Sequence, residues 1–258
     1  MLYFPQKIKD FIGNKKYERD SVGMSDSQVI LFDDMVLKIQ QSNSETANEV
    51  KMMKWLKDIV PVPELIAAEI ENGTSFILMS KTKGKMLCDE AFTNNPEKLL
   101  SLLSDGLKQL WSIDIKNCPC NNTLDFKLAA ARFNVENGLV DIDNTEPETF
   151  CENGFQSPEE LLKWLEENKP EEELTLTHGD FSLQNIFAEN DKISGFIDLG
   201  KAGIADKWQD IAICYRSLKH IFSSKQNDKF HPDMLFEKLG IEKNEEKLKY
   251  YILLDELF

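Results

Sequence analysis

The chain has 258 residues, of which 41% are hydrophobic. This is enough for one large domain or two lobes around a shared cleft, and it excludes general disorder. No stretch approaches the roughly 18 consecutive apolar residues that cross a bilayer, so we expect no membrane partner. A net charge of −15 argues against nucleic acid, whose phosphates attract basic surfaces, and favours a cationic partner.

The N-terminal segment and the cysteines indicate a cytoplasmic protein. Lysines and an aspartate interrupt the apolar residues of the first thirteen positions, so this segment lacks the apolar core of a secretory signal. The five cysteines are scattered and odd in number, which favours ordinary thiols over a disulfide framework or a zinc site.

Strands dominate the predicted elements before residue 84. Asn72-Gly73 and Asp33-Asp34 each stand between two apolar runs, as in β-hairpins. Apolar residues at helical spacing predict a helix between the two hairpins, closed by Pro61 and Pro63. The predicted order is strands 27–32 and 35–40, helix 47–58, then strands 64–71 and 74–79.

Helices dominate the remainder of the chain. Ser157, Pro158 and Glu160 have the spacing of a capped helix start. The predicted helices are 96–112, 124–137, 157–168, 207–222, 232–239 and 244–258, and the predicted strands are 174–178, 185–189 and 192–198. We therefore expect an α+β protein of two lobes, residues 1–83 and 84–258.

Three polar side chains lie where the strands of the second lobe end. Asp180 occupies the loop after the first strand, Asn185 begins the second, and Asp198 follows the third, thirteen residues after Asn185. Carboxylates converging there would repel by about 4 kcal/mol at ~4 Å and an effective dielectric near 20. Oxygen ligands suit Mg²⁺ bound together with substrate phosphates. Kinases arrange a catalytic base and two metal ligands with this order and spacing.

Residues 141–173 form an acidic segment. Twelve carboxylates stand there against Lys163 and Lys169. Two interpretations remain open, a solvated acidic face and an electrostatic trap for a polycation.

His178-Gly-Asp180 with Asn185 and Ile197-Asp198 resembles the signature of the aminoglycoside phosphotransferases, which are relatives of the protein kinases. The likeness is greater to the type III 3'-phosphotransferases of Gram-positive bacteria. It extends to residues 195–200, 205–212 and 249–258, and so covers nearly the whole chain.

The resemblance implies a bilobal protein-kinase-like fold, with an N-terminal antiparallel sheet and one helix and a larger, mainly helical C-terminal lobe. It implies transfer of the γ-phosphoryl group of ATP to the 3'-hydroxyl of aminoglycosides such as kanamycin and neomycin. Asp180 would be the catalytic base, and Asn185 and Asp198 would hold Mg²⁺. His178 would have a structural role in the loop.

The N-terminal lobe would bind the nucleotide. By resemblance, Lys38 contacts its phosphates, Glu49 pairs with Lys38, and Ser25 belongs to the loop that covers the phosphates. Ser80 and Thr82 fall where the adenine-contacting hinge lies. Val36 replaces a base-stacking tyrosine of the relatives, which leaves the choice between ATP and GTP open.

Substrate contacts are expected at the acidic segment and the C-terminus. The resemblance implies contacts from Glu146, Arg216, Asp255, Glu256 and the terminal carboxylate of Phe258. Residues 182–184 and Lys201 depart from the type III pattern, so the set of accepted drugs is open. We expect a monomer or a weak homodimer whose partner is a small cationic molecule.

Two other functions remain open. One is a kinase of the same fold that acts on another small hydroxylated molecule, which the acidic segment disfavours because a neutral substrate gains little from it. The other is a nucleotide-binding pseudokinase that serves as an interaction module. The presence of Lys38, Asp180, Asn185 and Asp198 together disfavours it.

Overall fold

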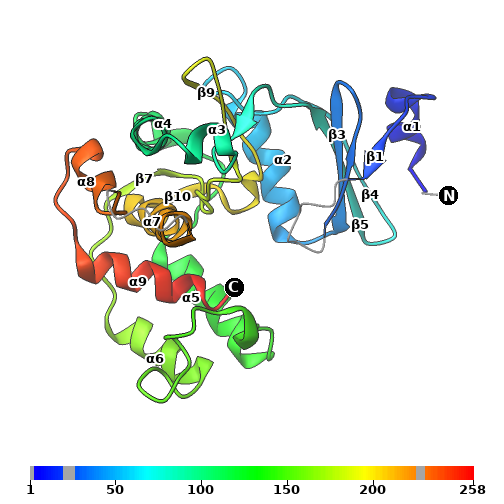
Figure 1. Cartoon of the computed structure of the whole chain (residues 1–258). Coiled ribbons are helices and arrows are strands. Elements are labelled where there is room, and N and C mark those ends of the chain that lie inside the picture. Colours follow the sequence, from blue (N-terminus) through cyan, green and yellow to red (C-terminus); the bar gives the residue numbers. More distant parts are fainter. Residues whose placement is uncertain (1–2, 20–26, 225–229) are drawn as a thin grey trace.

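A computed structural model describes residues 3–19, 27–224 and 230–258, and it has two lobes (Figure 1). The N-terminal lobe contains a five-stranded antiparallel sheet in the order β1-β2-β3-β5-β4. Its strands are β1 (Glu18–Arg19), β2 (Gln28–Leu31), β3 (Met35–Gln41), β4 (Leu65–Glu71) and β5 (Thr74–Ser80). Both predicted hairpins are present.

Alternation along β3 decides which way its lysine points. Leu37 is fully buried among the apolar residues on one face of the sheet. Successive side chains of a strand point to opposite faces, so Lys38 and Val36 lie on the other face, which is turned towards the C-terminal lobe. Val36 accordingly packs against the larger apolar cluster, which includes Ile77 and Met79 of β5 as well as residues of that lobe.

The helix α2 (Ser44–Leu56) lies between the sheet and the C-terminal lobe (Figure 1). It begins with a capping box, in which the Asn43 side chain accepts from the Thr46 backbone N–H at 2.9 Å and the Thr46 hydroxyl accepts from the Asn43 backbone at 3.2 Å. Glu49 is buried on the same helix as Met52, Met53 and Leu56, so burial of this face fixes the position of Glu49.

The N-terminal helix α1 (Gln6–Ile12) was not predicted from the sequence. It has seven residues, too few to establish a helical period, and it contacts β4. Burial of Ile8 and Ile12 against the outer side of the sheet stabilises it.

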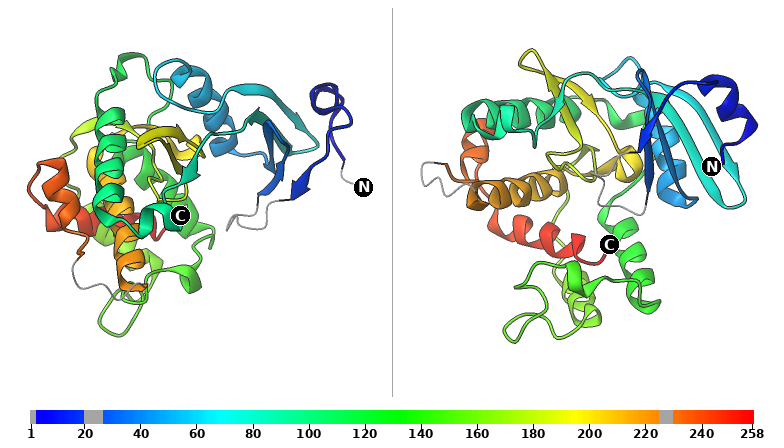
Figure 2. Two further views of the ribbon diagram at one scale, coloured as in Figure 1. Left: turned by 45° about the horizontal axis from the view of Figure 1, so that its top comes forward. Right: turned by 45° about the vertical axis from the view of Figure 1, so that its right-hand side comes forward.

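The C-terminal lobe is mainly helical, with two small antiparallel sheets. Figure 2 shows this lobe from two further directions, with the N-terminal sheet to one side of it. The helices are α3 (Glu90–Thr93), α4 (Pro96–Trp111), α5 (Leu124–Glu136), α6 (Pro158–Glu167), α7 (Lys207–Ser224), α8 (Met234–Leu239) and α9 (Glu245–Asp255). The strands are β6 (Lys85–Met86), β7 (Leu174–Thr177), β8 (Ile186–Glu189), β9 (Lys192–Phe196) and β10 (Gly203–Asp206). Three short 3₁₀ turns complete it: η1 (Ile115–Asn117), η2 (Ile142–Asn144) and η3 (Leu199–Lys201).

Most predicted elements of this lobe are present with shifted ends. The last predicted helix, 244–258, ends at Asp255, and the helix predicted at 232–239 begins at Met234. The elements α3, β6 and β10 were not predicted from the sequence, because such short elements depend on the segments that they contact. None of the described helices is long and apolar enough to cross a membrane.

Candidate active site

The loop between β7 and β8 carries Asp180 and Asn185. It starts with a glycine in a left-handed conformation, φ +84° at Gly179. A Cβ atom there would lie 1.9 Å from the carbonyl oxygen of Lys201. Only glycine therefore allows this loop to pass so close to the η3 segment.

The side chain of Asp210, in the first turns of α7, holds the start of this loop. Its two carboxylate oxygens accept hydrogen bonds from the backbone N–H groups of His178 at 2.7 Å and Gly179 at 2.8 Å. Complete burial raises the pKa of Asp210 from 3.8 to about 6, although these hydrogen bonds and nearby His178 oppose the shift. Asp210 has no predicted role, since nothing in the spacing indicates a contact with a loop 31 residues earlier in the chain.

Within the loop, Asp180 and Asn185 hold each other in place. The amide of Asn185 donates to a carboxylate oxygen of Asp180 at 2.9 Å and to its backbone oxygen at 3.1 Å. Ser182 N–H also donates to the Asp180 backbone oxygen at 2.8 Å. One carboxylate oxygen of Asp180 thus remains available to a ligand.

The side chain of His178 holds the start of the loop through a hydrogen bond. Its ring Nε2 lies 2.8 Å from the backbone oxygen of Ile197, and because a carbonyl only accepts, Nε2 carries the hydrogen. This hydrogen bond ties the loop to the residue before Asp198.

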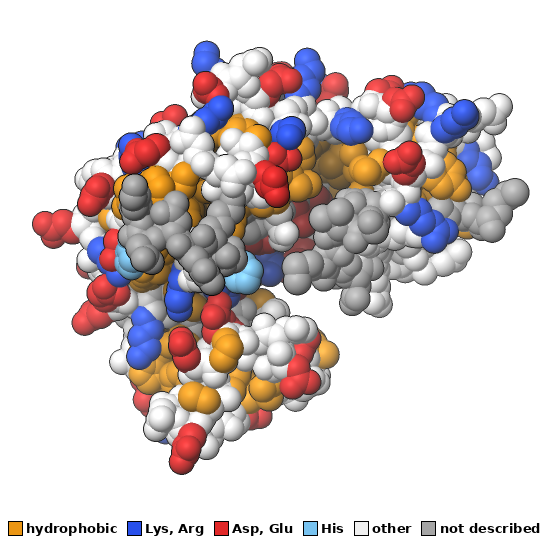
Figure 3. All heavy atoms as spheres, viewed as in Figure 1, with side chains coloured by type: hydrophobic (Ala, Val, Ile, Leu, Met, Phe, Trp, Pro, Cys, Tyr) orange, Lys and Arg blue, Asp and Glu red, His pale blue; other side chains and the backbone are white. Residues whose placement is uncertain are grey.

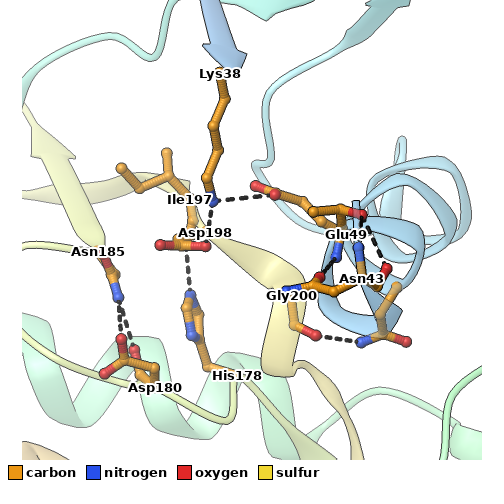
Figure 4. Close-up of polar contacts among 11 residues, drawn as sticks. Lys38, Asn43, Glu49, His178, Asp180, Asn185, Ile197, Asp198 and Gly200 are labelled. Carbon is orange, nitrogen blue, oxygen red and sulfur yellow. Dashed lines mark hydrogen bonds and ion pairs between the residues drawn. The ribbon is translucent and has the colours of Figure 1, made fainter. Parts of the chain in front are cut away.

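Asp198 meets the lysine of the N-terminal lobe. Lys38 Nζ lies 2.7 Å from Asp198 Oδ1 and 3.1 Å from Glu49 Oε2, so β3, α2 and the end of β9 meet at one ammonium group (Figure 4). Burial disfavours the charge of Lys38, but attraction to Glu49 and Asp198 outweighs burial and raises the pKa of Lys38. For Asp198, burial is likewise outweighed by attraction to Lys38, and its pKa is lowered.

The residues present fit a hard cation. Asp198 Oδ2 and Asn185 Oδ1 have no hydrogen bond within the described ranges, and the Asp198 side chain is 44% exposed. No group of three or more His, Cys, Asp or Glu side chains in those ranges could hold a metal. A cation here would therefore take two protein oxygens and complete its shell with water or phosphate, as Mg²⁺ commonly does.

The predicted hinge lies beside these groups. Ser80 ends β5, and its hydroxyl accepts from the Glu64 backbone at 2.9 Å. The Thr82 side chain packs on Gly195 of β9, and its backbone forms no hydrogen bond with the described residues. Ser25 and the rest of 21–25 lie outside the described residues.

A cavity of about 880 Å³ lies next to the loop, and all five predicted substrate residues line it. Its charged lining is mostly acidic, and acidic side chains are visible in the recess between the lobes (Figure 3). Several other residues line the cavity and were not predicted as substrate contacts, among them Cys88, Asp141, Asn144, Thr145 and His220. Their positions depend on how the 141–147 loop and α7 pack.

A polar network orders the wall of this cavity. Glu256 accepts from the Glu146 backbone N–H at 2.9 Å and from Arg216 at 3.2 Å, and Arg216 also pairs with Asp255. The network joins the acidic segment to α7 and to the end of α9.

Only part of the acidic segment faces the cavity. Asp141 and Glu146 line it, whereas other carboxylates such as Glu152, Glu167 and Glu171 are exposed on the surface. The solvated acidic face therefore describes the exposed carboxylates, and the interpretation as an electrostatic trap stays a prediction for those that line the cavity.

Comparison with known proteins agrees with this geometry. The profile of a family described as "Phosphotransferase enzyme family" matches residues 16–235. An aminoglycoside 3'-phosphotransferase of Enterococcus faecalis is 39% identical over 98% of this chain and 97% of the relative, and one of Niallia circulans is 32% identical over 99% and 97%.

Solved structures show the same fold. The aminoglycoside phosphotransferase APH(3'')-Id from Streptomyces rimosus aligns with a TM-score of 0.81 at 21% identity, covering 97% of this chain and 95% of that one. An aminoglycoside-3'-phosphotransferase of type VIII aligns with a TM-score of 0.79 at 23% identity, covering 98% of both. The expected fold class is confirmed, and the chain belongs to the phosphotransferase enzyme family and, within it, to the aminoglycoside 3'-phosphotransferases.

Proposed function

We propose that this enzyme transfers the γ-phosphoryl group of ATP to the 3'-hydroxyl of aminoglycosides such as kanamycin and neomycin, and so confers resistance to them. The observation that carries the proposal is the meeting of Lys38, Asp180, Asn185 and Asp198 beside a carboxylate-lined cavity. The names of the relatives support the acceptor position. Two more distant structures, in complexes with ADP and streptomycin and with ADP and hygromycin B, are compatible with this pairing of ligands.

Asp180 would align the acceptor hydroxyl and receive its proton. Asn185 fixes one of its oxygens, which leaves the other to accept a hydrogen bond from the sugar. Phosphoryl transfer needs little covalent help, so this positioning supplies a large part of the rate enhancement.

Lys38 would contact the nucleotide phosphates, held in place by Glu49. Asn185 and Asp198 would hold Mg²⁺, which when bound neutralises phosphate charge. Because Lys38 already bonds to Asp198, the lysine and the metal ligand are organised together.

The cavity would recognise substrate by charge. Aminoglycosides carry several ammonium groups, which would form charge-assisted hydrogen bonds with Asp255, Glu256 and the Glu146 loop. Arg216 would keep Asp255 and Glu256 in position between binding events.

The adenine would bind along the hinge. The free backbone groups of Thr82 supply one donor and one acceptor for the base. Val36 offers an aliphatic surface in place of a stacking ring, so GTP remains an alternative donor. The boundary between the nucleotide-binding and catalytic lobes would fall at residues 83 and 84, and use of ATP would place the reaction in the cytoplasm.

The test is a panel of acceptors with the purified protein, Mg²⁺ and either ATP or GTP. Kanamycin and neomycin should be phosphorylated, whereas tobramycin, which lacks the 3'-hydroxyl, should not be phosphorylated at comparable rates. Turnover of tobramycin as fast as kanamycin would refute the 3' assignment. Turnover of small amino alcohols or of neutral hydroxylated molecules in preference to both drugs would refute the substrate class.

A further inference from the structure

A second, smaller cavity of about 330 Å³ lies on the other side of Phe258 from the substrate cavity. It is bounded by the first half of α2, the 119–122 loop, α5 and the η3 segment. Three of its lining side chains are lysines, Lys51, Lys127 and Lys201, and one is acidic, Glu45. A cationic cavity is unexpected in a chain whose net charge is −15.

Lys127 is the most unusual of these residues. It is only 8% exposed, yet its ammonium group makes no hydrogen bond and no ion pair with any residue in the described ranges. Its one contact of note is with the Phe258 ring, whose centroid lies 5.4 Å from Nζ. Burial lowers the pKa of Lys127 to about 8, despite attraction from Asp255. A buried ammonium group without a partner is costly, which indicates that a partner of opposite charge completes this site.

Lys201, the last residue of η3, lies near the same ring. Its Nζ lies 6.0 Å from the Phe258 centroid, and it too has no ion pair among the described residues. Lys51 is exposed at the cavity and is likewise unpaired there. By contrast, many other lysines of this acidic chain pair with carboxylates, for example Lys57 with Glu64 and Lys247 with Asp206.

The charge of the cavity decides what it can hold. Three lysines against Glu45 repel a cationic aminoglycoside, so the cavity does not extend the substrate site. Lys38, the lysine at the nucleotide site, does not line it. The remaining lining groups are divided between polar side chains, among them Ser44 and Asn121, and apolar ones, among them Pro119, Phe126 and Ala130.

We propose that this cavity is a binding site for a small oxyanion of the phosphate class, held between Lys127 and Lys201. Charge-assisted hydrogen bonds from the two ammonium groups would offset the burial of Lys127. Lys51 attracts the anion at the surface, and Glu45 weakens its binding. The cavity volume of about 330 Å³ leaves room for the anion together with bound water.

Titration of the purified chain with inorganic phosphate at constant ionic strength and pH 7 tests the proposal. One phosphate should bind per chain. Lys127→Met should weaken binding by about tenfold or more, the loss expected for one charge-assisted hydrogen bond, and Lys51→Met should weaken it less. Glu45→Gln should strengthen binding several-fold, because it removes the one acidic side chain of the cavity.

Two variants separate this site from others. Lys9→Met makes the same charge change at an exposed lysine that also contacts an aromatic ring, that of Tyr3, and it should leave phosphate binding unchanged. Lys38→Ala, at the nucleotide site, should also leave it unchanged.

The proposal is overturned if the wild-type chain binds no phosphate stoichiometrically. It is equally overturned if Lys38→Ala abolishes binding, which would assign the phosphate to the nucleotide site. If Lys127→Met does not fold, the variants of the exposed residues Lys51 and Glu45 test the proposal instead. Equal phosphate affinities in Lys51→Met, Glu45→Gln and wild type would exclude this cavity as the binding site.

Discussion

The proposed catalytic centre and the proposed substrate cavity differ in how their charged side chains are paired. In the catalytic centre each charged side chain has a fixed partner: Lys38 contacts Glu49 and Asp198, and Asp180 contacts Asn185. In the cavity the carboxylates Asp141, Glu146, Asp255 and Glu256 outnumber Arg216, the one lysine or arginine among the described residues of its lining. The centre is organised before ligands arrive, whereas the cavity has an excess of negative charge that a cationic ligand would balance.

This difference separates two kinds of kinetic effect. Groups that act on the transferring phosphoryl group contribute in the transition state and should change kcat. Carboxylates that attract the substrate stabilise ground state and transition state alike, so their loss should mainly raise KM.

The largest effect is expected for Asp180→Asn. The amide keeps an oxygen for the hydrogen bond from Asn185 but cannot take a proton, so kcat should fall by roughly 10² to 10⁴ with little change in KM for kanamycin. Steady-state kinetics measure this. Asp105→Asn, at an exposed aspartate of α4, is the matched control and should behave as wild type. A decrease in kcat of less than tenfold would mean that Asp180 is not the base.

Asp210→Asn should alter the pH dependence of stability. The pKa of Asp210 is raised from 3.8 to about 6, so its contribution to stability is fully present below pH 3.8 and is lost as pH rises through about 6. This group alone should therefore lower the free energy of unfolding by up to about 3 kcal/mol across that interval.

Urea unfolding of both proteins between pH 4 and pH 7 measures this contribution. The decrease in the free energy of unfolding with rising pH that Asp210 causes should be present in wild type. It should be missing in Asp210→Asn, whatever the absolute stability of the variant. Parallel curves for the two proteins would contradict the raised pKa.

Glu256→Gln tests the cavity. The amide oxygen can still accept from the Glu146 backbone, but the negative charge is lost, so KM for kanamycin should rise about tenfold while kcat changes less. Glu242→Gln, at an exposed glutamate outside the cavity, provides the control. A fall in kcat with unchanged KM would place Glu256 in the catalytic centre instead.

Salt should have the smallest effect. Raising the ionic strength from about 0.1 M to about 1 M shortens the Debye length from about 10 Å to about 3 Å. KM for kanamycin should rise several-fold, and the dependence should be shallower in Glu256→Gln. A KM that does not depend on salt would mean that short-range contacts alone hold the substrate.

The spacing of the sequence predicted that Asp180, Asn185 and Asp198 come together, because these residues are close in the chain. Asp180 and Asn185 share one loop, and Asp198 follows the next hairpin, so strand periodicity and turn residues are sufficient to bring them to one edge. Lys38 was found through its place on a predicted strand and through the family resemblance.

The sequence did not predict the contacts that depend on packing between distant segments. Asp210 reaches the catalytic loop only because α7 packs against β7, and α1 exists only because the sheet buries two of its isoleucines. Neither contact leaves a periodic or turn signal in the chain.

The sequence by itself determined the two lobes, the order of their main elements, the residues of the catalytic loop and the acidic character of the chain. These follow from local spacing, turn chemistry and composition. Only the tertiary structure decided which carboxylates face the proposed substrate cavity, which side chain holds the start of the β7–β8 loop, and that three lysines line the cavity beside Phe258. Those choices depend on burial between segments far apart in the chain, where the cost of an unpaired buried charge selects the partner.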